Sequence, residues 1–194
     1  MNIYYHFLAE ESDYFCGVQK TPSVLDDIFW RFMEGERAGG DYPGSVVFDM
    51  GLRYPGIVVA DMIQNNLGYC LLSAKARKLL ELHSGVEIEF LAFKLRNKKG
   101  RMETGDYYIA NVIGTRDCVD MKRTEGQLSL SEPGTFMTLR KLYLEARKIP
   151  PDARLFRIQA MPEVLIIRED LKAVFDQQGV TGVGYVRVGD AVRY

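Results

Sequence analysis

A pattern of strand, helix and strand occurs twice in this chain, and no other feature constrains the fold as strongly. The two segments are residues 71–93 (LLSAKARKLLELHSGVEIEFLAF) and 166–188 (IIREDLKAVFDQQGVTGVGYVRV). Each starts as a short apolar strand, continues as an amphipathic helix and passes through a turn of small residues into a second strand. The alternative is chance similarity, because few positions are identical and such units are common. The pattern describes a scaffold rather than a reaction.

The rest of the chain predicts an α+β fold of mixed, largely antiparallel sheets with a few helices. We expect a helix from Thr21-Pro22-Ser23 with Ser23 as its cap, and a short helix or a strand over 56–65. Strands are expected at residues 2–8, 45–50, 106–113, 127–130, 136–145, 155–158 and 164–167. The two repeated units would then lie in one compact domain over residues 1–194, with residues 1–65 as a possible N-terminal subregion.

Both copies contain an apolar doublet in the second strand, Phe90-Leu91 and Tyr185-Val186, where the alternation of apolar and polar residues changes phase. A change of phase sends side chains to the opposite face of a sheet. The doublet therefore indicates either a β-bulge in each copy or a strand that is buried on both faces.

The charge and cysteine content exclude several classes of protein. Lys and Arg number 25 against 26 Asp and Glu, so no electrostatic argument favours a nucleic-acid or membrane partner. No apolar run approaches the roughly 20 residues that span a bilayer, and the start, MNIYYHFLAEESDYF, lacks the basic region of a secretory signal. Three widely spaced cysteines are typical of free, buried thiols, so we expect a cytoplasmic protein.

No catalytic, cofactor-binding or metal-binding residue is predicted. His6 and His83 lack ligand spacing, and the glycines of GVTGVG (179–184) follow a helix instead of preceding one, as a phosphate-binding loop requires. The basic run from Lys94 to Arg101 is expected either to dock an acidic partner or to protect an exposed strand edge from aggregation.

Several short motifs occur in a familiar order: LLSAKARKLLE, YYIANV, CVD, KIPPDARLFRI, IREDLKAVF and GVTGVGYVRV. The ordered set, over residues 65–190, resembles the bacterial immunity proteins of polymorphic-toxin systems, namely the former domain-of-unknown-function family called immunity protein eleven. The matching positions are Ser73, Asn111, Asp120, Phe156, Thr181 and Gly182. The chain departs from the family at 121–124 (MKRT), where the family often has a Ser. The resemblance implies a cytoplasmic, non-catalytic protein that neutralises a cognate toxin by stoichiometric association.

Two further interpretations stay open beside toxin binding. For toxin binding, loop placement suggests aromatic and Arg anchors, which are Tyr14, Phe15, Tyr42, Tyr54 and Arg101. An enzyme or small-ligand protein would instead need a deep pocket that gathers several of Asp61, Asp106, Tyr107, Asn111, Asp120 and Arg157. A structural module would form an oligomer, such as a homodimer.

Overall fold

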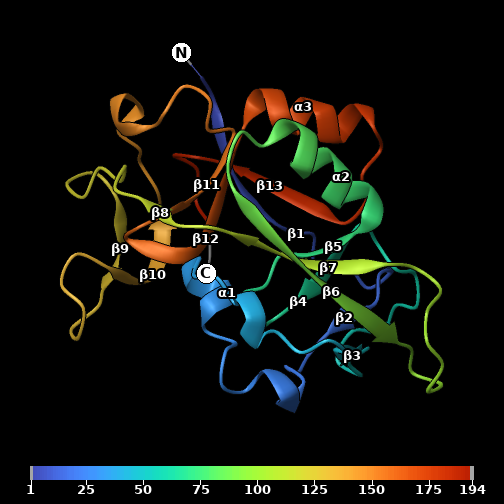
Figure 1. Ribbon diagram of the computed structural model, residues 1–194. Coiled ribbons are helices and arrows are strands. Elements are labelled where there is room, and N and C mark those ends of the chain that lie inside the picture. Colours follow the sequence, from blue (N-terminus) through green and yellow to red (C-terminus); the bar gives the residue numbers. More distant parts are fainter. Residues whose placement is uncertain (1, 193–194) are drawn as a thin grey trace.

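The computed structural model describes residues 2–192 and shows sheets covered on one side by two helices (Figure 1). The helices are α1 Arg31–Glu34, α2 Ala74–His83 and α3 Glu169–Gln177, with 3₁₀ turns at η1 Ser23–Leu25, η2 Gly39–Asp41 and η3 Ala146–Lys148. The strands are β1 Tyr4–Ala9, β2 Gly17–Val18, β3 Val47–Asp49, β4 Met62–Asn65, β5 Leu71–Ser73, β6 Ile88–Arg96, β7 Tyr107–Val112, β8 Thr115–Arg116, β9 Glu125–Leu128, β10 Phe136–Lys141, β11 Leu155–Ile158, β12 Met161–Arg168 and β13 Val183–Arg187.

The strands form two large sheets and one hairpin. The five-stranded sheet has the order β13-β1-β12-β11-β8, the six-stranded sheet has the order β2-β4-β5-β7-β6-β3, and β9 pairs with β10. Pairing is antiparallel except for β2–β4, β3–β6 and β8–β11. Helices α2 and α3 lie side by side above the sheets (Figure 1). The predicted α+β class with mixed, largely antiparallel sheets is confirmed.

The repeat seen in the sequence is structural. The units are β5-α2-β6 and β12-α3-β13, and in each the two strands are separated by one antiparallel strand, β7 in the first and β1 in the second. Ser73 pairs with Tyr107, and its counterpart Arg168 pairs with Tyr4. Both are the N-cap residues of their helices. The similarity therefore includes an inserted strand that begins with Tyr-Tyr in both units.

Each helix also places a cation over an aromatic pair of the sheet beneath it. The Arg77 guanidinium lies 4.5 Å from the ring centroid of Tyr108 and 5.3 Å from that of Phe90. The Lys172 ammonium lies 4.6 Å from the ring centroid of Tyr185 and 5.6 Å from that of Tyr5. In both helices the cation pairs with a carboxylate one turn later, at 3.7 and 2.6 Å. Matching contacts at matching positions argue for duplication rather than chance.

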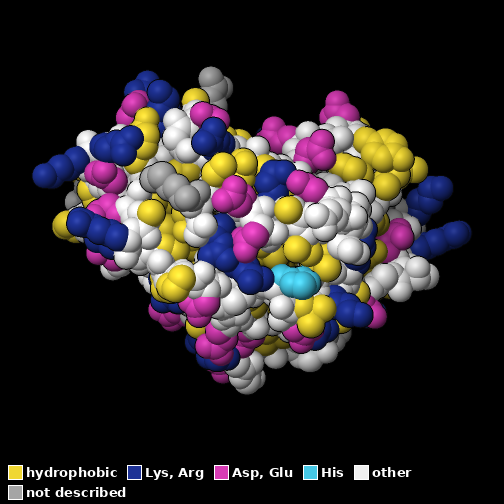
Figure 2. Space-filling model, turned by 90° about the horizontal axis from the view of Figure 1, so that it is seen from above, with side chains coloured by type: hydrophobic (Ala, Val, Ile, Leu, Met, Phe, Trp, Pro, Cys, Tyr) yellow, Lys and Arg dark blue, Asp and Glu magenta, His cyan; other side chains and the backbone are white. Residues whose placement is uncertain are grey.

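The two units close over one shared core. Most of its buried side chains come from the two units and the two inserted strands, and the others come from β4, β11 and the residue before β5. They are Phe7, Met62, Cys70, Leu72, Ala76, Leu80, Ala110, Val112, Leu155, Leu165, Ile167, Leu171 and Phe175. Figure 2 shows the outer face above α2 and α3, where basic and acidic side chains are interspersed. The inward faces of the helices thus build the core, and their outward faces are polar.

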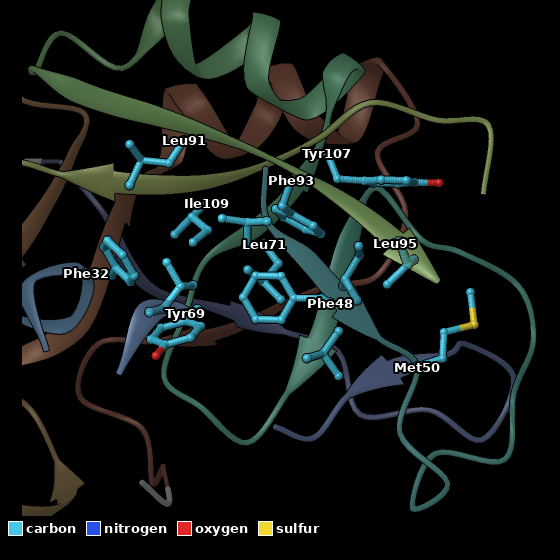
Figure 3. Close-up of a cluster of buried hydrophobic side chains, with 14 of the residues drawn as sticks. Phe32, Phe48, Met50, Tyr69, Leu71, Leu91, Phe93, Leu95, Tyr107 and Ile109 are labelled. Carbon is cyan, nitrogen blue, oxygen red and sulfur yellow. The ribbon is translucent and has the colours of Figure 1, made fainter. Parts of the chain in front are cut away.

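The doublets Phe90-Leu91 and Tyr185-Val186 are not bulges. Strand β6 keeps an unbroken register with β7, and β13 keeps an unbroken register with β1. Phe90 packs against the shared core under the helices, whereas Leu91 joins Phe93 in a second cluster on the other face (Figure 3). The bulge prediction is wrong because β6 changes its buried face at the doublet without an extra residue. Phe90 is half-buried under the helices, and from Leu91 onward buried residues of the opposite face alternate with exposed ones.

Two helical predictions near the N-terminus were also wrong. The helix expected from Ser23 is divided into η1, a run of turns and the short α1, and Ser23 makes no capping bond because Pro22 occupies the N-cap. Gly35 ends α1 with φ 74°, and a Cβ there would lie 2.7 Å from the Val112 carbonyl oxygen. Residues 56–65 form no helix but lead into β4, so the strand alternative holds.

Residues before 65 supply strands to both large sheets. Strand β1 lies between β12 and β13, while β2, β3 and β4 belong to the six-stranded sheet. A single domain over residues 1–194 stays a prediction, and this sharing of strands favours it.

Candidate partner-binding surface

Three of the five predicted anchors lie together at one end of the molecule. Tyr14 and Phe15 form an edge-to-face ring pair 5.3 Å apart, and Phe15 pairs with Val58 across a parallel bridge. Tyr54 lies in the same loop as Val58, and Ile57 beside it is 77% exposed. Tyr14 is 66% exposed. We call Tyr14, Phe15, Tyr54, Ile57 and Val58 the loop surface. It is apolar and accessible, as a protein-binding surface requires.

The loop surface is held by two polar side chains, the buried Gln64 and the half-buried Lys98. The Gln64 amide donates to the carbonyl oxygens of Ser12 and Phe15, both at 2.8 Å. The Lys98 ammonium donates to three successive carbonyls over residues 54–56. A Cβ on Gly56 would lie 2.3 Å from the carbonyl oxygen of Tyr14, so the two segments approach as closely as glycine permits. The apolar side chains are therefore presented on a fixed backbone.

The other two predicted anchors are placed differently. Tyr42 is half-buried: its hydroxyl donates to the Ala92 carbonyl at 2.9 Å and its ring packs against Phe32. Burial raises the pKa of Tyr42 well above its usual range. Arg101 is exposed in the turn after β6, the turn that also carries Lys98. The structure thus brings Arg101 to the end that carries the loop surface, whereas Tyr42 belongs to the core.

The basic run from Lys94 to Arg101 is largely occupied by internal contacts. Lys94 pairs with Asp106 at 2.9 Å, and Arg96 forms a two-pronged pair with Asp49. Strand β6 lies between β7 and β3, so it is not a sheet edge and the edge-protection hypothesis is wrong. The parallel register with β3 places Asp49 opposite Arg96 and so accounts for the second pair.

A hollow that the sequence did not indicate lies between residues 29–36 and the β9–β10 hairpin. Its volume is about 670 Å³. It is lined by Phe29, Trp30, Met33, Glu34, Glu36, Thr115, Ser129, Ser131, Glu132, Thr135, Phe136, Met137, Met161, Pro162 and Glu163. We call it the acidic groove. The signal available in the sequence is the single tryptophan, Trp30, beside Phe29.

The six residues of the pocket hypothesis do not meet in one place. None of them lines the acidic groove or two further hollows, one beside residues 19–24 and one between β1 and β4. Tyr107 belongs to the core, Asp106 pairs with Lys94, and Asp120 accepts backbone bonds in a turn. Among residues 2–192, no group of three or more His, Cys, Asp or Glu side chains is arranged to hold a metal ion. The three cysteines are buried and free, and burial raises each thiol pKa, that of Cys16 to about 11.

Asp61 instead joins the two repeated units. Its carboxylate accepts from the Ser73 hydroxyl at 2.6 Å and from the Thr181 backbone at 3.0 Å, and Lys75 lies 3.4 Å away. Burial by itself raises the pKa of Asp61, but these hydrogen bonds outweigh it and the net pKa is lowered. Gly182 follows, and a Cβ there would lie 2.4 Å from a carbonyl oxygen of β4.

The remaining positions that carried the family resemblance are structural as well. Asn111 is buried and donates to the Glu36 carbonyl at 2.6 Å and to Glu89 at 3.2 Å. Glu89 in turn accepts from the backbone of Ala38 and Gly39. Phe156 is a core residue. The resemblance therefore rests on residues that make contacts within the scaffold.

Comparison with known proteins shows the family to which this chain belongs. Among the described residues, no helix is long and apolar enough to cross a membrane. No curated protein matches the chain. The model of the Immunity protein family (Imm11) matches residues 13–190, so the match begins earlier than the region 65–190 that carried the resemblance, and it includes the loop surface. The match extends over nearly the whole chain, and the chain belongs to the Immunity protein family (Imm11).

Proposed function

We propose that this protein binds a cognate toxin in the cytoplasm and neutralises it by stoichiometric association. Membership of an immunity protein family supports this function. The observation that carries it is the loop surface, where apolar side chains are exposed on a backbone fixed by Gln64 and Lys98. Exposed, contiguous apolar side chains on a soluble domain indicate a protein interface.

Binding alone accounts for neutralisation, because a partner that covers the active surface of a toxin excludes its substrate. The affinity would concentrate in a few anchors that become fully buried. Tyr14 and Ile57 are the most exposed members of the loop surface, and burial of one such side chain contributes about 1.5–3 kcal/mol. The fixed backbone lowers the entropy lost on binding. Arg101 extends this surface with a cation, and Tyr42 would act through the core beneath it.

The test is co-expression with a candidate toxin module, sought in the open reading frame next to the gene for this protein. We expect protection of the cell and a one-to-one complex, together with a mass of 22.1 kDa for the free protein if it is a monomer. Tyr14→Ala and Ile57→Ala should each weaken binding about tenfold or more. Leu82→Ala is the matched control, because Leu82 is an exposed aliphatic side chain, at 65%, on α2. The absence of both protection and complex would refute the proposal.

A further inference from the structure

The acidic groove combines an apolar floor with an acidic rim, in which one carboxylate, Glu163, lies within electrostatic reach of the buried Arg157. Its exposed apolar side chains are Phe29 at 42%, Trp30 at 37% and Met137 at 57%. Met33, Phe136 and Met161 continue the apolar lining inward. Methionines fill irregular gaps and adapt to different partners, and aromatic rings are enriched in interface cores. An apolar groove of this kind favours a protein segment over a solvated ion.

The charge of the groove is of one sign. Glu34, Glu36, Glu132 and Glu163 line it, and no Lys or Arg does. Within residues 2–192 none of these four carboxylates forms an ion pair. The net charge of the chain is only −1, so this is a local concentration of negative charge and not a general property of the protein.

The wall of the groove is fixed from inside the protein. The buried guanidinium of Arg157 donates to the carbonyl oxygens of Phe32 and Met33, at the end of α1. It also donates to Val112 at 2.9 Å and to Pro162 at 2.8 Å, which lie on β7 and β12. Segment 29–34 is thereby tied to both large sheets. A preformed wall lowers the cost of ordering when a partner binds.

We propose that the acidic groove is a second contact with the toxin, and that it takes a Lys- or Arg-bearing segment of the toxin surface. This inference rests on the proposed function. A long basic side chain fits both parts of the groove: its aliphatic stem packs on Met137 and Trp30, and its charged head meets the carboxylates. The Arg31 guanidinium already lies 5.6 Å from the Trp30 ring centroid, so Trp30 contributes apolar surface and the carboxylates contribute the charge. An acidic or purely apolar segment would leave the four carboxylates uncompensated.

The charge of the groove is testable in the protein alone, because Trp30 is the only tryptophan and it lines the groove. Caesium and iodide quench tryptophan fluorescence and carry opposite charges. A negative surface concentrates cations, so the ratio of the caesium to the iodide quenching constant should be higher in the wild-type protein than in the variant Glu34→Gln/Glu36→Gln/Glu132→Gln. We expect a difference of about twofold or more at low salt. An unchanged ratio of the two quenching constants would overturn the inference.

The matched control removes three exposed carboxylates from the helical side of the molecule, as Glu81→Gln/Asp152→Asn/Asp176→Asn. Both triple variants change the net charge equally. We expect the groove variant to bind the toxin module of the adjacent gene at least about tenfold more weakly at 50 mM salt, with a smaller loss at 500 mM, and the control to change less than threefold. Equal affinities for the two variants would overturn the groove proposal and leave the proposed function intact. If the wild-type protein formed no complex, the proposed function itself would fail.

Discussion

Replacement of Arg157 by methionine tests how much of the fold depends on one buried cation. The side chain is 1% exposed, and its donors satisfy four backbone carbonyl oxygens. Burial lowers the pKa of this guanidinium to about 10. Methionine keeps most of the apolar stem but leaves the four acceptors without their donor. Each hydrogen bond to a charged group contributes about 1.5–3 kcal/mol to stability. The four lost bonds are partly offset, because the variant no longer bears the free-energy cost of burying a charge. The expected net loss is about 3–5 kcal/mol.

Urea denaturation followed by circular dichroism gives the free energy of unfolding, and Trp30 fluorescence reports on the segment that Arg157 holds. We expect a lower midpoint with an unchanged slope, and a red shift of Trp30 emission before global unfolding. Arg154→Met is the control, because Arg154 is partly exposed and pairs at the surface with Asp170 at 3.2 Å. That pair should contribute less than about 1 kcal/mol. A loss below 1 kcal/mol in Arg157→Met would show that the four contacts do not hold the segment.

The remaining predictions concern pH, the junction between the units, the cations on the helices and the loop surface. Burial lowers the pKa of His6 to about 4, so the unfolded chain binds a proton at a higher pH than the folded protein does. The free energy of unfolding should therefore fall by up to about 3 kcal/mol between pH 6.5 and 4. His6→Gln should reduce this pH dependence when unfolding is measured at several pH values. Asp61→Asn should cost about 1–2 kcal/mol at pH 7, and the difference from wild type should shrink as the pH falls towards 3, because the lowered pKa makes the ionised form stabilising. Arg77→Gln and Lys172→Gln should each cost about 0.5–1 kcal/mol and add in the double variant, since the two cations lie in separate units. Gly56→Ala should weaken toxin binding by displacing the loop surface, with little change in the Trp30 emission of the native protein.

The repeated units were predictable from sequence because each places local helix signals beside short apolar strands. Ser73 accepts from the Ala76 backbone at 3.3 Å, as a helix-capping residue should. Gly179 has φ 59° at the end of α3. These signals depend on a few neighbouring residues. The sequence did not predict which strand lies between the two strands of each unit. Both intervening strands, β1 and β7, lie outside the repeated segments, and β1 is also far from its partners in sequence.

The placement of three predicted anchors in loops agrees with the structure, whereas their role in binding stays a prediction. Tyr14, Phe15 and Tyr54 were placed in loops, and the structure gathers them. The acidic groove was missed because the sequence predicts a helix that continues from Ser23 through Phe29 and Trp30. In the structure that helix is interrupted, so Phe29 and Trp30 turn outward. Which side of a short helical segment faces solvent depends on Arg157, which is 125 positions away from Phe32 in sequence.

The repeated units and the segments outside them have different roles, and this explains why the sequence shows a clear scaffold but no obvious binding site. Neither the loop surface nor the acidic groove uses residues 71–93 or 166–188; the first is formed by residues 14–58 and the second by residues 29–36, 115–137 and 161–163. The repeated units close over one core, where packing restricts side chains to a few shapes. The segments outside them carry exposed side chains that can change without disturbing that core. A protein that must match one partner, while keeping its own fold, gains from this arrangement because recognition and stability reside in different residues.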